Sequence, residues 1–88
     1  MVAKVFISGF VQGVGFRQHI KKKARSLGLT GWIRNLQDGR VEALFSGSRE
    51  KIEEVISECN KGPFLAEIKN VTVEWVDLDE EYTGFKII

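Results

Sequence analysis

Three glycines and one arginine near the start of the chain have the types and spacing of an anion-binding loop. Segment 8–17 reads Ser-Gly-Phe-Val-Gln-Gly-Val-Gly-Phe-Arg, between an apolar stretch and a lysine-rich one. Because Gly9, Gly13 and Gly15 lack a Cβ, the backbone there can take positive φ and turn N–H groups toward one point at a helix N-terminus. The Arg17 guanidinium adds a planar fork of donors that matches two phosphate oxygens. The segment predicts a phosphate site.

Two better-known phosphate motifs do not match this loop. The Walker pattern Gly-x-x-x-x-Gly-Lys-Ser/Thr is missing. A dinucleotide fingerprint is also incomplete, because Gln18 stands where its third glycine would fall. On spacing alone, an ordinary strand-to-helix loop without a ligand stays open as the alternative.

Apolar patterns on both sides position the loop. The run Val5-Phe6-Ile7 predicts a strand over residues 3–8 with both faces covered or nearly covered. After the loop, apolar residues recur at the spacing of an amphipathic helix that ends at Gly28: Phe16, Ile20, Ala24 and Leu27. The cations of its later turns complement the helix dipole and are typical of a solvated face.

The middle of the chain has the pattern of a hairpin. Residues 30–36 alternate, with Ile33 and Asn35 on one face, and Asp38-Gly39 is a tight-turn signal before a second alternating run, 41–45. Strands 30–36 and 41–45 are therefore expected to pair antiparallel.

The second half repeats the alternation of helix and strand. Ser48 is the expected N-cap of a helix whose apolar stripe is Ile52, Val55, Ile56 and Cys59, and Gly62-Pro63 ends it. Residues 64–69 read as a connection, 71–76 as a strand, 77–81 as a solvated acidic loop with a weak metal signal, and 84–88 as a short edge strand. The order predicts an α+β ferredoxin-like β-α-β-β-α-β sandwich in one domain, 1–88: an antiparallel sheet with two helices on one face and a short extra C-terminal strand.

Composition narrows the function classes. The net charge of +1 argues against a nucleic-acid binder that works by bulk electrostatics. One cysteine excludes an internal disulfide, and no apolar run is long enough to span a bilayer. We expect a cytoplasmic monomer with no nucleic-acid or membrane partner and no cofactor or metal. Trp32 and Trp75 are expected to pack rather than to stack on bases.

Two separate runs, together with the C-terminal residues, resemble one enzyme family. Residues 7–17 read Ile-x-Gly-x-Val-Gln-Gly-Val-x-Phe-Arg, and residues 31–41 read Gly-Trp-Ile-Arg-Asn-x-x-x-Gly-x-Val. Both look like signatures of the acylphosphatases, and Tyr82-x-x-Phe85-x-Ile87 is similar to the end of that family. Gly15 stands where the animal enzymes carry a bulkier residue, which resembles bacterial and archaeal members and the acylphosphatase-like domain of hydrogenase-maturation proteins. Ile33 is slightly larger than is usual there.

The resemblance implies metal-independent hydrolysis of the carboxyl-phosphate bond of acyl phosphates, with inorganic phosphate as product and competitive ligand. It implies two catalytic residues: Arg17 holds the phosphate oxygens and Asn35 positions the attacking water. Arg17 would share phosphate binding with the amides of the preceding loop, formed by Gly9, Phe10, Val11, Gln12, Gly13, Val14, Gly15 and Phe16. A non-catalytic phosphate-binding or regulatory module is the main alternative. An RNA-binding sheet and a carbamoyl-phosphate-handling role are two others.

The chemistry is consistent with so few side chains. A carboxylate leaves without a general acid, because the pKa of its conjugate acid is about 4. The protein mainly has to position the reactants and stabilise charge on the phosphoryl oxygens. His19 is the obvious rival for a base, but a base near neutrality is not required. Cys59 falls on an apolar stripe and is expected to be buried rather than nucleophilic.

Overall fold

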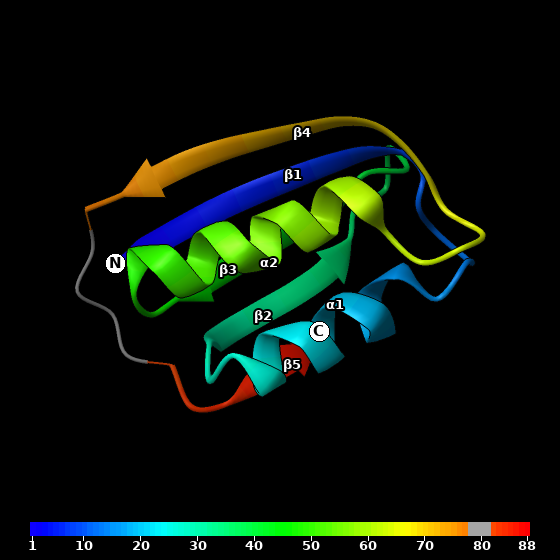
Figure 1. The fold of residues 1–88 in the computed structure, drawn as a ribbon. Helices are drawn as coiled ribbons and strands as arrows, with labels where there is room; N and C mark the ends of the chain where they lie inside the picture. The colour runs from blue at the N-terminus through cyan, green and yellow to red at the C-terminus, as the bar shows by residue number, and fades with distance from the viewer. Residues whose placement is uncertain (78–81) are drawn as a thin grey trace.

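The computed structural model describes residues 1–77 and 82–88 of the chain. The elements are β1 (Val2–Phe10), α1 (Phe16–Ser26), β2 (Thr30–Asn35), β3 (Val41–Ser46), α2 (Arg49–Lys61), β4 (Glu67–Val76) and β5 (Phe85–Ile87). The strands form one sheet in the order β4-β1-β3-β2-β5, and both helices cover the same face of it (Figure 1). The predicted ferredoxin-like plan is confirmed.

The sheet is mixed rather than wholly antiparallel. Strands β4, β1, β3 and β2 pair antiparallel, as predicted, but β5 runs parallel to β2, with Gly31 opposite Phe85 and Ile33 opposite Ile87. The ring of Phe85 is buried and stacks on that of Phe45 at a centroid distance of 5.4 Å. This stack joins the short edge strand to β3 within the core.

The two faces of strand β1 are covered to different degrees. Ala3, Val5 and Ile7 are buried under the helices, whereas Lys4 and Phe6 on the opposite face are half-buried. Pairing with both β3 and β4 protects the strand's edges, and this central position permits an apolar run without a second helical layer. The Arg40 guanidinium lies over the Phe6 ring at 5.0 Å and gives that face part of its cover.

The helices end where the sequence predicts. Leu29 N–H donates to the Ala24 carbonyl and Gly28 N–H to the Arg25 carbonyl, which is the Schellman arrangement that stops α1. Helix α2 begins at the predicted N-cap, where the Ser48 side chain accepts from the Lys51 N–H. The apolar faces of both helices meet the sheet in a core that includes Phe16, Ile20, Ala24, Ile52, Val55 and Cys59.

Strand β4 begins earlier than expected. The sequence predicts a connection over 64–69, but Glu67 and Ile68 already pair with Phe10 and Gly9. A register shift between Ser8 and Gly9 produces this pairing, and such a bulge cannot be read from alternation alone. The pairing brings the start of β4 beside the first residues of the glycine loop (Figure 1).

The structure describes only Asp77 of the predicted acidic loop, residues 77–81. Residues 78–81 of the predicted acidic loop lie outside the described residues.

The two tryptophans differ in their surroundings. Trp75 packs against the core and under the Arg49 guanidinium at 4.7 Å, while Trp32 is half-buried with the Arg34 guanidinium 5.3 Å from its ring. No helix within 1–77 or 82–88 is long and apolar enough to cross a membrane.

Candidate active site

The glycine loop ends in a left-handed residue that turns directly into α1. Gly15 is the N-cap of the helix, with φ +79° and ψ +14°, and Gly13 has φ +75°. The first turn of α1 contains no acidic residue, and no side chain caps it. The positive end of the helix dipole is therefore directed at the loop without a local carboxylate to neutralise it.

The loop amides are free to bind a ligand. The backbone N–H groups of residues 12–15 donate no hydrogen bond to any atom of the ranges 1–77 and 82–88. Consecutive N–H groups in turn conformation form a concave donor surface that suits an anion. The first amides of an α-helix lack intrahelical acceptors as well.

Arg17 lies beside these amides. A pocket of about 460 Å³ is lined by Val11, Gly13, Gly15, Phe16, Arg17 and Gln18, together with Lys21, Arg25, Lys86 and Ile87. The Arg17 side chain is half-buried and has no ion-pair or hydrogen-bond partner in the described part of the chain. Its guanidinium can therefore turn into the pocket without breaking an existing contact.

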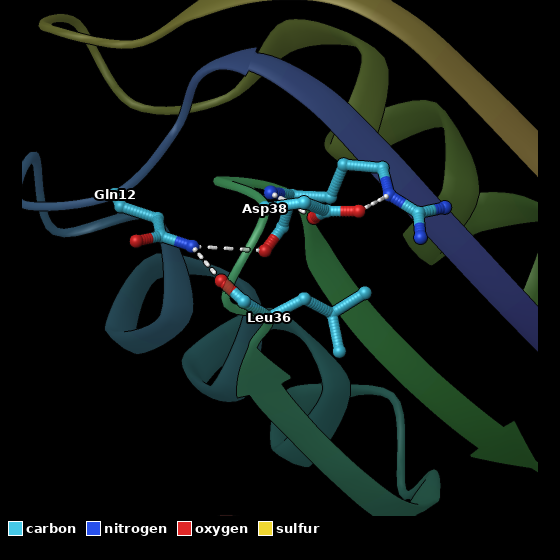
Figure 2. Close-up of polar contacts among 4 residues, drawn as sticks. Gln12, Leu36 and Asp38 are labelled. Carbon is cyan, nitrogen blue, oxygen red and sulfur yellow. Dashed lines mark hydrogen bonds and ion pairs between the residues drawn. The ribbon is translucent and has the colours of Figure 1, made fainter.

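Gln12 connects the loop to the hairpin between β2 and β3. Its Nε2 group donates to the Leu36 carbonyl at 2.9 Å and to the Arg40 carbonyl at 3.0 Å (Figure 2). Hydrogen bonds within the turn close it. The Leu36 N–H donates to the Arg40 carbonyl at 2.8 Å, and the Arg40 Nε group donates to the Asp38 carboxylate at 2.8 Å. The hydrogen bond from the Arg40 N–H, with the guanidinium, lowers the pKa of the Asp38 carboxyl.

Asn35 is the last residue of β2 and directly precedes one of the two carbonyls that Gln12 holds. Alternation along β2 puts its side chain on the face of the buried Ile33, which is the face that the helices cover. The Asn35 residue is exposed and is not among the residues lining the Arg17 pocket. The tertiary contact of Gln12 thus joins the two predicted site segments through their backbones.

The predicted loop residues differ in what they contact. Val11 and Phe16 line the pocket but are also buried in the core, so they anchor the two ends of the loop. The pocket lining omits four residues predicted to bind phosphate: Gly9, Phe10, Gln12 and Val14.

Gly9 marks the close approach of β1 and β4. Its φ is +126°, and a Cβ there would overlap the Glu67 carbonyl oxygen and stand 2.7 Å from the Lys69 nitrogen. Only glycine fits this backbone contact.

His19 has a structural contact rather than a place in the pocket. Its Nε2 lies 2.8 Å from a Glu58 carboxylate oxygen, which links α1 to α2. This hydrogen bond holds the pKa of Glu58 below its usual value, against the opposing effect of burial. The contact is consistent with the expectation that His19 is not the base.

Cys59 also lies outside the lining of the Arg17 pocket. The side chain is fully buried on the inner face of α2, and burial raises the pKa of its thiol to about 12. A thiol with this pKa is a poor nucleophile near neutrality, in agreement with the prediction that Cys59 is a small core residue.

Sequence reasoning missed three cations that line the pocket with Arg17. They are Lys21, Arg25 and Lys86, and the first two were interpreted only as part of a solvated helix face. Their spacing was the available signal, because residues 17, 21 and 25 fall at i, i+4 and i+8 and share one side of an α-helix. Lys86 could not be found in this way, because β5 reaches the pocket only through the fold.

Known proteins resemble this chain over nearly its whole length. The family model for acylphosphatases matches residues 3–87. An acylphosphatase of Pelotomaculum thermopropionicum is 52% identical over 85 residues, which cover 97% of this chain and 92% of the relative. The crystal structure of an acylphosphatase from Bacillus subtilis matches with a TM-score of 0.96 at 29% identity, covering 100% of this chain and 99% of that one. A Coxiella burnetii acylphosphatase structure matches with a TM-score of 0.93 at 39% identity, covering 99% and 90%. With a loop, an arginine and a fold of this kind, the chain belongs to the acylphosphatase family.

Proposed function

We propose that this acylphosphatase cleaves the carboxyl-phosphate bond of its substrates with two side chains and one loop. The amides of the loop 9–16 and the Arg17 guanidinium hold the phosphoryl group, and Asn35 orients the attacking water. The observation that carries the proposal is the combination of free N–H groups at residues 12–15 with an Arg17 that has no partner among the described residues and lines one pocket with Gly13 and Gly15.

The binding step follows from charge and geometry. A phosphoryl group offers three oxygens, and the loop and Arg17 offer N–H donors from two directions. Phosphoryl transfer proceeds through a loose transition state with charge spread over those oxygens. Donors that are already in place stabilise that charge without reorganising, which is the main contribution that this reaction asks of a protein.

The leaving group needs no proton donor. Cleavage of the phosphorus–oxygen bond releases a carboxylate, which is stable as an anion near neutral pH. The oxygen of water forms the new bond to phosphorus, and its protons pass to solvent and the product phosphate. This balance explains how a site without a titrating acid or base can turn over.

Asn35 has the right chemistry to align the water. An amide can accept a hydrogen bond at its oxygen and donate from its nitrogen, so it fixes both the position and the orientation of a water molecule. Support comes from its place at the end of β2, on the helix-covered face and next to the carbonyl that Gln12 binds. The Gln12 contact would hold Asn35 in a constant relation to the phosphate loop.

The test is hydrolysis of benzoyl phosphate in buffer that contains a chelator. We expect rapid hydrolysis by the wild type, a loss of activity of at least about 100-fold in Arg17→Ala, and weakened competitive inhibition by phosphate. Asn35→Ala should lower kcat while inhibition by phosphate stays near the wild-type value.

Matched variants control for surface charge and amide loss. Arg49→Ala removes an exposed cation that pairs with Glu53, and Asn60→Ala removes an exposed amide on α2; both should keep wild-type rates. Activity of Arg17→Ala within tenfold of the wild type would contradict the assignment. A folded wild type that binds phosphate but hydrolyses no acyl phosphate would favour a non-catalytic module.

We also infer where this enzyme acts and what it binds. The enzyme would act as a cytoplasmic monomer on small-molecule acyl phosphates, with no metal or cofactor and with inorganic phosphate as product and competitive ligand. The unpaired Cys59 and the net charge of +1 support this setting.

A further inference from the structure

We propose that Lys21 recognises a second anionic group on the acyl part of the substrate. The preferred substrates would then be acyl phosphates whose acyl group carries a carboxylate or a phosphate, rather than those with a purely apolar acyl group. This inference rests on the proposed function, since it takes the phosphoryl group to lie at Arg17.

The position of Lys21 follows from helix geometry. Lys21 is four residues after Arg17 on α1, so the two side chains leave the same side of the helix about 6 Å apart along its axis. Both line the pocket of about 460 Å³. A pocket of this size falls in the range that holds a whole small ligand, so it has room for more than a phosphoryl group.

The charge of the pocket favours a further anion. Four of its lining residues are cations and none is Asp or Glu, although the net charge of the whole chain is only +1. Lys21 is half-buried and has no carboxylate within ion-pair distance among the described residues, whereas Lys23, two residues later, pairs with Glu54 at 3.8 Å. A positive hollow with protein walls attracts an anionic ligand more strongly than an open surface does.

Lys21 suits this role better than the other two cations. The Arg25 Nε group donates to the Phe85 carbonyl at 3.2 Å, which ties its guanidinium to β5. Lys86 borders the pocket, but it alternates with the buried Phe85, so its side chain leaves the opposite face of the sheet. Lys21 keeps a flexible stem, and its three N–H donors have no partner among the described residues, so they can reach an anion beyond the scissile bond.

The experiment compares two substrates of similar length in the same assay. Succinyl phosphate carries a distal carboxylate, and butyryl phosphate ends in a methyl group. We expect the wild type to have the higher kcat/KM for succinyl phosphate. Lys21→Gln should lower the succinyl-to-butyryl ratio about fivefold, the upper end for an exposed ion pair. Added salt should reduce the wild-type preference, because screening weakens the ion pair.

Two further variants sharpen the test. Lys21→Arg keeps the charge and should keep the preference, and Lys21→Glu should lower the ratio further than Lys21→Gln. Lys22→Gln is the matched control, because it makes the same change in net charge one residue away on α1, at an exposed position outside the pocket lining.

The outcomes separate this inference from the proposed function. A ratio that stays within twofold of the wild type in both Lys21→Gln and Lys21→Glu would overturn the role of Lys21. An equal loss in Lys22→Gln would also overturn it, since it would show a general effect of surface charge. If the folded wild type hydrolyses neither substrate, the proposed function itself fails.

Discussion

Adding one methyl group at either end of the glycine loop should have very different costs. Gly9 and Gly15 both have positive φ, +126° and +79°. A Cβ on Gly15 would meet no atom within 4 Å, whereas one on Gly9 would overlap the Glu67 carbonyl oxygen. Gly15→Ala therefore strains only its own backbone, and Gly9→Ala also forces β1 away from β4.

The magnitudes follow from these two situations. Left-handed backbone costs an alanine about 1–2 kcal/mol, and the restricted unfolded chain returns about 0.4–1 kcal/mol, so Gly15→Ala should lose about 1 kcal/mol. Gly9→Ala adds the cost of overpacking against a fixed backbone, about 1–3 kcal/mol, for a total of about 3 kcal/mol. A domain of this length has only about 4–13 kcal/mol of unfolding free energy, so the second loss is severe.

Urea denaturation followed by far-UV circular dichroism measures both variants. With an m-value of about 1.5 kcal/mol/M, the midpoint should fall by about 0.7 M in Gly15→Ala and by about 2 M in Gly9→Ala. Gly13→Ala is the control: its φ is +75° with no atom within 4 Å of a Cβ, so it should match Gly15→Ala. Equal losses at Gly9 and Gly15 would refute the argument from close backbone approach.

Two other predictions test contacts that join separate elements. Gln12→Ala removes both hydrogen bonds to the β2–β3 turn. The kcat for benzoyl phosphate should fall about tenfold, because the loop loses its fixed position relative to Asn35. The exposed Gln37→Ala variant should keep the wild-type kcat, and an equal kcat in Gln12→Ala and the wild type would contradict the role of Gln12. The contact with His19 lowers the pKa of Glu58, so its stabilisation is present above the unfolded carboxyl pKa and is lost as pH falls through the lower folded value. The unfolding free energy of Glu58→Gln should thus lie about 0.5–1 kcal/mol below that of the wild type at pH 6 and converge with it toward pH 3, and a constant difference would disprove the linkage.

Local signals in the sequence were enough to predict the helices and strands and their order along the chain. Gly28 follows the C-cap of α1, Ser48 caps the start of α2, and the alternation around Ile33 marks β2. These signals can be read from the sequence because capping and side-chain periodicity depend only on neighbouring residues. The positive φ at Gly13 and Gly15 was expected for the same reason. The family resemblance likewise rests on two short runs of residues, which the comparisons bear out.

Tertiary structure alone decided how these pieces meet. The parallel docking of β5, the bulge that starts β4 at Glu67, and the Gln12 contact with the hairpin all join segments far apart in the chain. Such contacts depend on three-dimensional packing, so no local sequence pattern predicts them. The same holds for the pocket: spacing along α1 sets Lys21 beside Arg17, but only the folded chain brings Lys86 and Ile87 of β5 against them to form a hollow.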